Sequence, residues 1–316
     1  MGPIIKSMTS FERLRPVAAV LLCLAGTQLL PAQSAPGEII GNKLPVPGKD
    51  VHGTTSKLSE VERDIVDNMD AQHQAEKLLQ YAISHHHVAT REIKLRAPGW
   101  RGQIALTSSM MTLMEVALNG EDLRVRAAAF EIDLAARNIE KTAATAGALI
   151  RSVQSDSKTA ASATWALGLL ANRGVETERI LGELRARRNT DDEQLRYWTV
   201  IAIGNIGSDE TVPDLLAAFH HDRAAHVRID AGGCSLAHCG MLTRAQRIQA
   251  VPGLIEMVED PKLDSETIKY GYRALREITD QPLADKADLW RQWYSEHGAE
   301  TTEKFRQFEK DADQDD

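Results

Sequence analysis

The stretch "LRYWTVIAIGNIGSDETVPDLLAAF", residues 195–219, decides the fold. It predicts two short apolar helices, because apolar side chains recur every three to four residues on both sides of the turn "GSDETVP". That turn should stop any longer helix. Neither helix would be stable alone in water, because its polar face is too narrow. We therefore expect this hairpin to bury its two sides against neighbouring hairpins.

Similar helical pairs recur from residue 103 onward, joined by short polar turns that often carry Gly, Asn or Asp. The sequence from residue 103 to 279 contains about five such helix pairs. No run alternates apolar and polar residues convincingly, so we expect essentially no β-sheet. The second helices superpose with steps of 34, 36, 32 and 40 residues when five positions are aligned: Arg126, Ala160, Arg196, Arg228 and Ile268. A step of this size is typical of a solenoid, in which each hairpin packs on the ones before and after it.

The motifs "LRYWTVIAIGNIG" and "TWALGLLANRG" resemble the second helix of bacterial HEAT repeats, in which Arg or Lys is followed by small residues and then Ala-Leu-Gly. The stretches "SDETVPDLLAAF" and "QAVPGLIEMVED" resemble the start of a repeat. The ending "ALREITDQPLADKADLWRQWY" resembles the segment that covers the last repeat. The resemblance spans about residues 103–295. It implies an all-α, right-handed α-α superhelix (a HEAT-like solenoid) of about five hairpins with a C-terminal capping helix.

The N-terminus has the three parts of a secretory signal peptide. Basic residues come first, the apolar run "PVAAVLLCLAGTQLL" follows, and the small residues of "PAQSA" permit cleavage after Ser34. An uncleaved membrane anchor stays open as an alternative, although residues 17–30 are shorter than the ~20 that span a bilayer. We therefore expect an exported protein, periplasmic or secreted, with no membrane span after cleavage.

The rest of the chain divides by composition. The pattern Ser59-x-x-Glu62 is typical of a capping box and predicts a helix that runs towards Ser84, followed by a basic loop. The domain map we expect is: residues 1–34 signal peptide, 35–57 flexible linker, 58–102 N-terminal helix and basic loop, 103–297 HEAT-like solenoid, and 298–316 acidic tail.

Charge and motifs narrow the function classes. The 316 residues carry 37 Lys and Arg against 45 Asp and Glu, a net charge of -8, which disfavours nucleic acid as a partner. The chain has no G-x-S-x-G, P-loop or Rossmann fingerprint. Among HEAT-like enzymes, di-iron hydroxylases use His-Glu pairs, and this chain has no His-Glu dipeptide. Other HEAT-like enzymes attach bilins to photosynthetic antenna proteins or remove damaged bases from DNA. The acidic net charge and the predicted export signal of this chain disfavour both activities. We therefore expect no catalytic activity and no cofactor.

The resemblance implies a scaffold or adaptor that binds a protein partner on a curved surface formed by the second helices. Polar and aromatic positions there are the predicted partner contacts: Arg126, Arg196, Tyr197 and Arg228. An alternative stays open for the arginines. In the family, the repeat Arg often reaches an acidic residue of the neighbouring repeat, so that a ladder of ion pairs fixes the stack.

Two cysteines and nearby histidines suggest a competing class. In a regular α-helix Cys234 and Cys239 would lie more than about 7 Å apart, which argues against a disulfide unless the helix ends early. Their oxidation state stays open. Cys234 and His238 are one turn apart and could ligate a metal, but no second Cys-x-x-Cys or His-x-x-x-His pair completes a set, so we expect no metal centre.

The competing hypothesis is an exported ligand- or metal-binding protein, or a HEAT-like lyase-type enzyme. Its site would lie near residues 220–239 or in residues 85–101, where a run of three histidines adjoins basic residues. That basic segment would receive an anionic partner or ligand.

Overall fold

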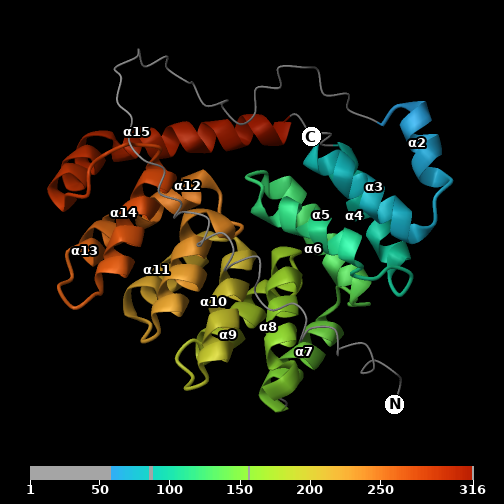
Figure 1. Cartoon of the computed structure of the whole chain (residues 1–316), viewed down its shortest axis with the longest axis horizontal. Helices are drawn as coiled ribbons and strands as arrows, with labels where there is room; N and C mark the ends of the chain where they lie inside the picture. The colour runs from blue at the N-terminus through green and yellow to red at the C-terminus, as the bar shows by residue number, and fades with distance from the viewer. Residues whose placement is uncertain (1–57, 85–87, 156, 315–316) are drawn as a thin grey trace, which may run out of the picture.

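The computed structural model describes residues 58–84, 88–155 and 157–314, and all regular structure within these ranges is helical (Figure 1). The predicted signal peptide and linker, residues 1–57, lie outside the described residues. No helix in the described ranges combines the length and the apolar character needed to cross a bilayer.

Five hairpins follow one another around an arc, which confirms the helical solenoid (Figure 1). Their helices are, in order, α5 (Ser108–Asn119) with α6 (Leu123–Ala136), α7 (Ala143–Ser155) with α8 (Ser157–Asn172), α9 (Thr177–Arg187) with α10 (Glu193–Ile206), α11 (Val212–His221) with the π-helical segments η3 (Val227–Gly233) and η4 (Ser235–Cys239), and α12 (Arg244–Arg247), η5 (Ile248–Ala250) and α13 (Val251–Val258) with α14 (Ser265–Thr279). The 3-10 turn η2 (Asp209–Thr211) joins α10 to α11.

Residues 195–219 form most of α10, all of η2 and most of α11, and α10 is buried along most of its length between two neighbours. A Cβ added at Gly168 of α8 would lie 2.7 Å from the backbone oxygen of Ala202 on α10. A Cβ added at Gly204 of α10 would lie 2.6 Å from the side chain of Ser235 on η4. Gly168 and Gly204 thus each let the next second helix approach closely. This contact explains why small residues recur at these positions.

The N-terminal part differs from the expected single helix and loop. A capping box at Ser59 and Glu62 begins α2 (Glu60–Asp67), as expected. The helix then ends, because the carboxylate of Asp70 accepts a hydrogen bond from the backbone N–H of His73 at 3.0 Å and caps a new helix, α3 (Ala71–Ile83).

Residues 88–100 are not a loop but a helix, α4 (Val88–Trp100). Its buried side chains, Ala89, Ile93, Ala97 and Trp100, recur at helical spacing and join the N-terminal core with α3 and α6. This burial outweighs the interruption by Pro98, which lies in the last turn. The loop was predicted because residues 85–102 show no clear apolar period and contain Pro98 and Gly99, and these local signals misled the prediction.

The C-terminus also differs from the prediction. Helix α15 (Ala287–Gln314) continues through the expected tail boundary at residue 298 and lies across the ends of the last hairpins (Figure 1). Trp290 is fully buried, as a cap requires. Phe305 packs against the same core, beneath the guanidinium of Arg244, and Glu309 accepts a hydrogen bond from the backbone N–H of Ala245 at 3.0 Å. These contacts hold the segment in place despite its acidic sequence.

Candidate functional site

The repeat arginines form rungs between adjacent second helices. The Nε of Arg196 donates to Oδ2 of Asp222 at 2.9 Å, and the two side chains are 3% and 6% exposed. The guanidinium of Arg228 donates to the carboxylate of Asp264 and, at 3.1 Å, to Oγ1 of Thr267. Each arginine therefore reaches an aspartate at the start of the next second helix. Arg196 and Arg228 therefore form the ladder of ion pairs between neighbouring repeats that the sequence left open as an alternative.

Asp264 both caps its own helix and pairs with the arginine of the preceding repeat. Its Oδ1 accepts hydrogen bonds from the backbone N–H groups of Glu266 and Thr267, so it caps α14. Hydrogen bonds from Thr267, together with the charge of Arg228, hold the pKa of Asp264 well below its usual range. The rung therefore requires an ionised carboxylate.

Arg126 has a different role. Its Nε donates to the carbonyl oxygen of Gly120 and its Nη1 to that of Gly240, each at 2.7 Å. Gly240 directly follows η4, so Arg126 braces the first hairpin against the fourth. Burial lowers the pKa of Arg126 to about 10, against the opposing charges of Glu121 and Asp122.

Most of the predicted partner contacts are buried side chains. Arg126, Arg196 and Tyr197 are all buried, and Tyr197 stacks on His226 with ring centroids 5.8 Å apart. Arg228 keeps a small exposed fraction, but its guanidinium is engaged in the ladder. The stack of hairpins therefore uses these side chains internally, and their role as partner contacts stays a prediction.

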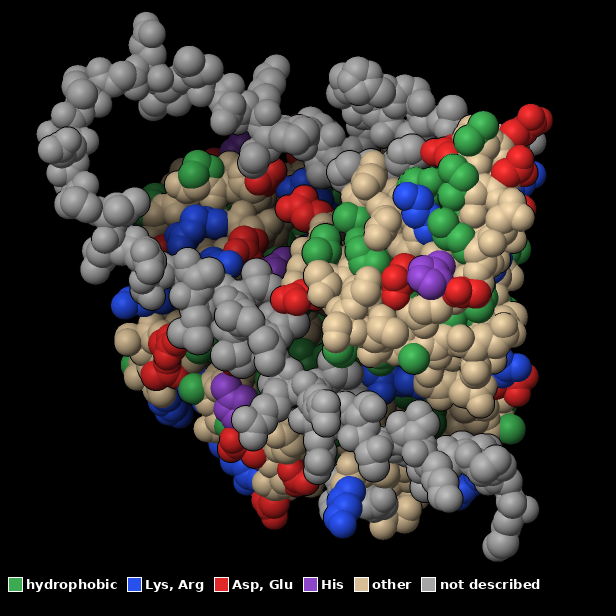
Figure 2. Space-filling model, turned by 45° about the vertical axis from the view of Figure 1, so that its right-hand side comes forward, with side chains coloured by type: hydrophobic (Ala, Val, Ile, Leu, Met, Phe, Trp, Pro, Cys, Tyr) green, Lys and Arg blue, Asp and Glu red, His purple; other side chains and the backbone are tan. Residues whose placement is uncertain are grey.

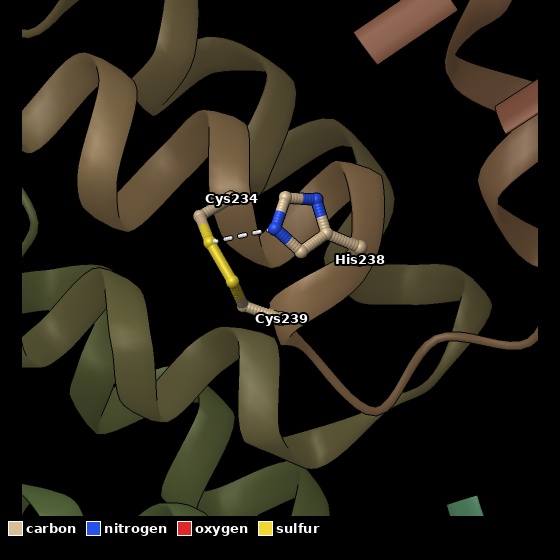
Figure 3. Close-up of side chains that lie close together, drawn as sticks. All are labelled: Cys234, His238 and Cys239. Carbon is tan, nitrogen blue, oxygen red and sulfur yellow. Dashed lines mark hydrogen bonds between the residues drawn. A yellow bond between two sulfur atoms is a disulfide. The ribbon is translucent and has the colours of Figure 1, made fainter. Parts of the chain in front are cut away.

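The structure brings Cys234 and Cys239 together as a disulfide, with their Cα atoms 5.1 Å apart (Figure 3). The expected separation of more than about 7 Å is wrong here because it assumed a regular α-helix. Segments η3 and η4 are π-helical, and hydrogen bonding from i to i+5 widens the turn so that residues five apart lie next to each other.

His238 joins this pair. Its Nε2 lies 3.5 Å from Sγ of Cys234, as Figure 3 shows. Its Nδ1 lies 2.7 Å from Oε2 of Glu277 on α14, and the other oxygen of Glu277 accepts from Nε of Arg273 at 2.7 Å. Burial alone would raise the pKa of Glu277, but the hydrogen bonds and charges of His238 and Arg273 together lower it.

A cleft of about 330 Å³ lies along the same two second helices. Its lining comes from η3 and the residues before it, and from α14: Ala225, His226, Ile229, Asp230, Glu266, Tyr270 and Arg273. Arg273 connects the cleft to the cysteine cluster, because its guanidinium lies over the ring of Tyr270 at 5.4 Å while its Nε donates to Glu277. We call this continuous region the η3–α14 surface.

The sequence predicted only one of the two helices that form the η3–α14 surface. The interval 220–239 contains the η3 side, but the α14 side was missed. Glu266, Tyr270, Arg273 and Glu277 follow at spacings of four, three and four residues, so they share one face of a helix. That spacing, placed on the second helix of the next repeat, is the signal that could have found them.

The other suggested location, residues 85–101, carries less free charge than expected. The three histidines at 85–87 lie outside the described residues. Arg96 pairs with Asp67 at 2.7 Å and with Glu92 at 3.1 Å, and Arg101 pairs with Glu140 at 3.4 Å. A smaller cleft of about 200 Å³ beside Arg101 is lined by both Glu131 and Lys141. Across the visible face in Figure 2, acidic and basic side chains are likewise interspersed.

Comparison with known proteins supports the repeat. A family model described as PBS lyase HEAT-like repeat matches residues 195–221, which form α10, η2 and α11. A comparison with curated proteins finds no match. The match covers the second helix of one hairpin and the first helix of the next, and the same packing continues through the described hairpins on both sides. The match and the helical hairpins on both sides of it support a HEAT-like repeat protein.

Proposed function

We propose that the protein is an exported HEAT-like scaffold that binds a protein partner and has no catalytic activity of its own. The observation that carries the proposal is the cleft within the η3–α14 surface, which lies between two consecutive second helices and offers groups of several kinds. A solenoid of this type presents extended surfaces without needing a deep pocket.

The chemistry of the cleft fits a protein better than a small anion or a nucleic acid. His226, Asp230, Glu266 and Arg273 place both signs of charge beside the ring of Tyr270. Tyr and Arg are the residue types that most often dominate protein interfaces, whereas nucleic-acid surfaces carry an excess of positive charge. The partner we propose therefore presents a polar segment with charges of both signs.

Export is the second part of the proposal and rests on the residues before position 35. A C-terminally tagged chain expressed in its native host should appear in the periplasmic or extracellular fraction, with a mature N-terminus at Ala35. Recovery of the intact chain from the cytoplasmic fraction would remove this part and leave the scaffold proposal standing.

The scaffold itself is tested by capture from the exported fraction. Tagged residues 35–316 serve as bait, and bound proteins are identified by mass spectrometry. We expect a protein that is retained by the unaltered bait and lost with Glu266→Ala/Arg273→Ala. The matched control is Glu256→Ala, which removes an exposed acid on α13, outside the cleft. Equal capture by both variants would place the partner elsewhere, and no reproducible partner would contradict the scaffold proposal.

A further inference from the structure

We propose that Cys234, His238 and Cys239, in their reduced form, bind one zinc ion, and that the Cys234–Cys239 disulfide closes this site. The proposal does not depend on the partner proposed above. The sequence left Cys234 and His238 without a third ligand, and the π-helical turn supplies Cys239.

The ligand atoms are already close enough for a single ion. The two Sγ atoms and a ring nitrogen of His238 lie within 4.8 Å of one another. In a tetrahedral site with metal–ligand bonds of 2.0–2.3 Å, ligand atoms lie roughly 3.3–3.8 Å apart. The distance of 3.5 Å between Nε2 of His238 and Sγ of Cys234 falls in this range. Once the S–S bond is broken, small side-chain rotations complete the set.

Glu277 orients the imidazole for this task. When the carboxylate of Glu277 accepts a hydrogen bond from Nδ1–H, the lone pair of Nε2 is directed at Sγ of Cys234 (Figure 3). Arg273 in turn fixes Glu277 through its other oxygen. Glu277 is therefore a positioning residue, and the arrangement is the carboxylate–histidine–metal pattern of many zinc sites.

Burial and charge also suit a zinc ion. Cys234 is buried, whereas His238 and Cys239 are partly exposed, so an ion can reach the site and a water can fill a fourth position. Two thiolates and one Zn²⁺ have no net charge together, which limits the cost of placing them at a partly buried position. Thiolate and imidazole are the ligands that zinc prefers in proteins.

The conversion between the two forms is a balanced exchange. A dithiol such as dithiothreitol passes two electrons and two protons to the protein disulfide. The S–S bond breaks, two cysteine thiols form, and the reagent becomes its cyclic disulfide. Zn²⁺ then displaces one proton from each thiol and binds both thiolates and the neutral His238.

The test uses the purified full chain, reduced and then desalted without oxygen, with free thiols counted. Zinc binding is measured by competition with a chromophoric chelator, and Co²⁺ is used as a spectroscopic probe. We expect one Zn²⁺ per reduced chain and none per oxidised chain. Bound Co²⁺ should show thiolate-to-metal charge-transfer absorption for two sulfur ligands.

Variants assign the ligands. Cys234→Ser and His238→Ala should each weaken zinc binding at least about 100-fold, and Glu277→Gln about 10- to 100-fold with the cobalt spectrum retained. His297→Ala, which removes a histidine of α15 outside this cluster, should change nothing. If a ligand variant fails to fold, the cobalt spectrum of the unaltered chain decides. A disulfide that resists native reduction, a reduced chain without zinc, or binding that survives Cys234→Ser/Cys239→Ser would overturn the proposal.

Discussion

Arg196 on α10 and Asp222, which precedes the next second helix, form a nearly solvent-free ion pair, with Nε and Oδ2 2.9 Å apart. Asp222 also accepts a hydrogen bond from the backbone N–H of Ala224 at 2.8 Å. One carboxylate therefore holds the neighbouring arginine and the first turn of its own helix. This relationship fixes how consecutive hairpins sit against each other, and it explains why the sequence repeats an arginine there.

Asp222→Ala should destabilise the protein by about 3–5 kcal/mol, because the charge of Arg196 would stay buried without its partner. The measurement is chemical denaturation followed by circular dichroism. The control is Arg196→Met/Asp222→Ala, which removes both charges and should recover part of the loss. Equal losses for the single and double variants would show that the pair adds nothing beyond the cap.

Gly168→Ala should destabilise by about 1–3 kcal/mol, because the added methyl group meets the backbone of Ala202 and forces α8 and α10 apart. Gly182→Ala is the matched control: it also lies inside a helix, but a Cβ there meets no atom within 4 Å. That change should stabilise by about 0.5–1 kcal/mol. The close approach of second helices fails as an explanation if both changes shift the melting temperature upward.

Trp290→Ala should cost about 3–5 kcal/mol, since it empties a fully buried site on α15 and removes the hydrogen bond from its Nε1 to the carbonyl of Ala284 at 3.1 Å. The neighbouring Leu289 is 40% exposed, and Leu289→Ala should cost under about 1 kcal/mol. Thermal melts of the two variants give the comparison. Similar small losses would mean that α15 does not cap the solenoid.

Asp264 links stability to pH. Its pKa in the folded chain is held below the value of about 3.9 that it has when unfolded. Its contribution is therefore complete above about pH 4 and is lost as the pH falls through the folded pKa. Asp264→Asn should lower stability at pH 7 by about 0.5–1 kcal/mol and flatten the dependence below pH 4. Denaturation curves from pH 7 to pH 2 check this, and parallel curves for both proteins would contradict it.

The hairpins could be predicted from sequence because the second helices share parts of one pattern: an arginine near the start in three of them, Arg126, Arg196 and Arg228, and small residues within, including Gly168 and Gly204 where the next helix touches. Helix α4 could not, because Pro98 and Gly99 are strong local signals for a loop and only tertiary burial of side chains such as Ile93 overrides them. The burial of the predicted contact residues Arg126, Arg196 and Tyr197 could not be foreseen for the opposite reason. Their type was informative, but sequence does not tell a buried rung from an exposed contact.

The cysteine pair shows a third limit. Its distance depends on whether residues 227–239 follow α- or π-helical hydrogen bonding, and no residue pattern in this stretch distinguishes the two. The same holds for Glu277, which reaches His238 from 39 residues further along the chain. Side chains that contact each other across two neighbouring repeats can be found in the sequence only when the second helices are aligned by the repeat period.

The central claim is that the η3–α14 surface binds a protein partner, and the most direct measurement is the dissociation constant of the captured partner for three purified proteins. These are the unaltered chain, Glu266→Ala/Arg273→Ala, and Glu256→Ala, each shown by circular dichroism to be folded. We predict at least a tenfold weakening for the double variant, as for truncated interface hot spots, and an unchanged constant for Glu256→Ala. Equal dissociation constants for all three proteins would contradict the account.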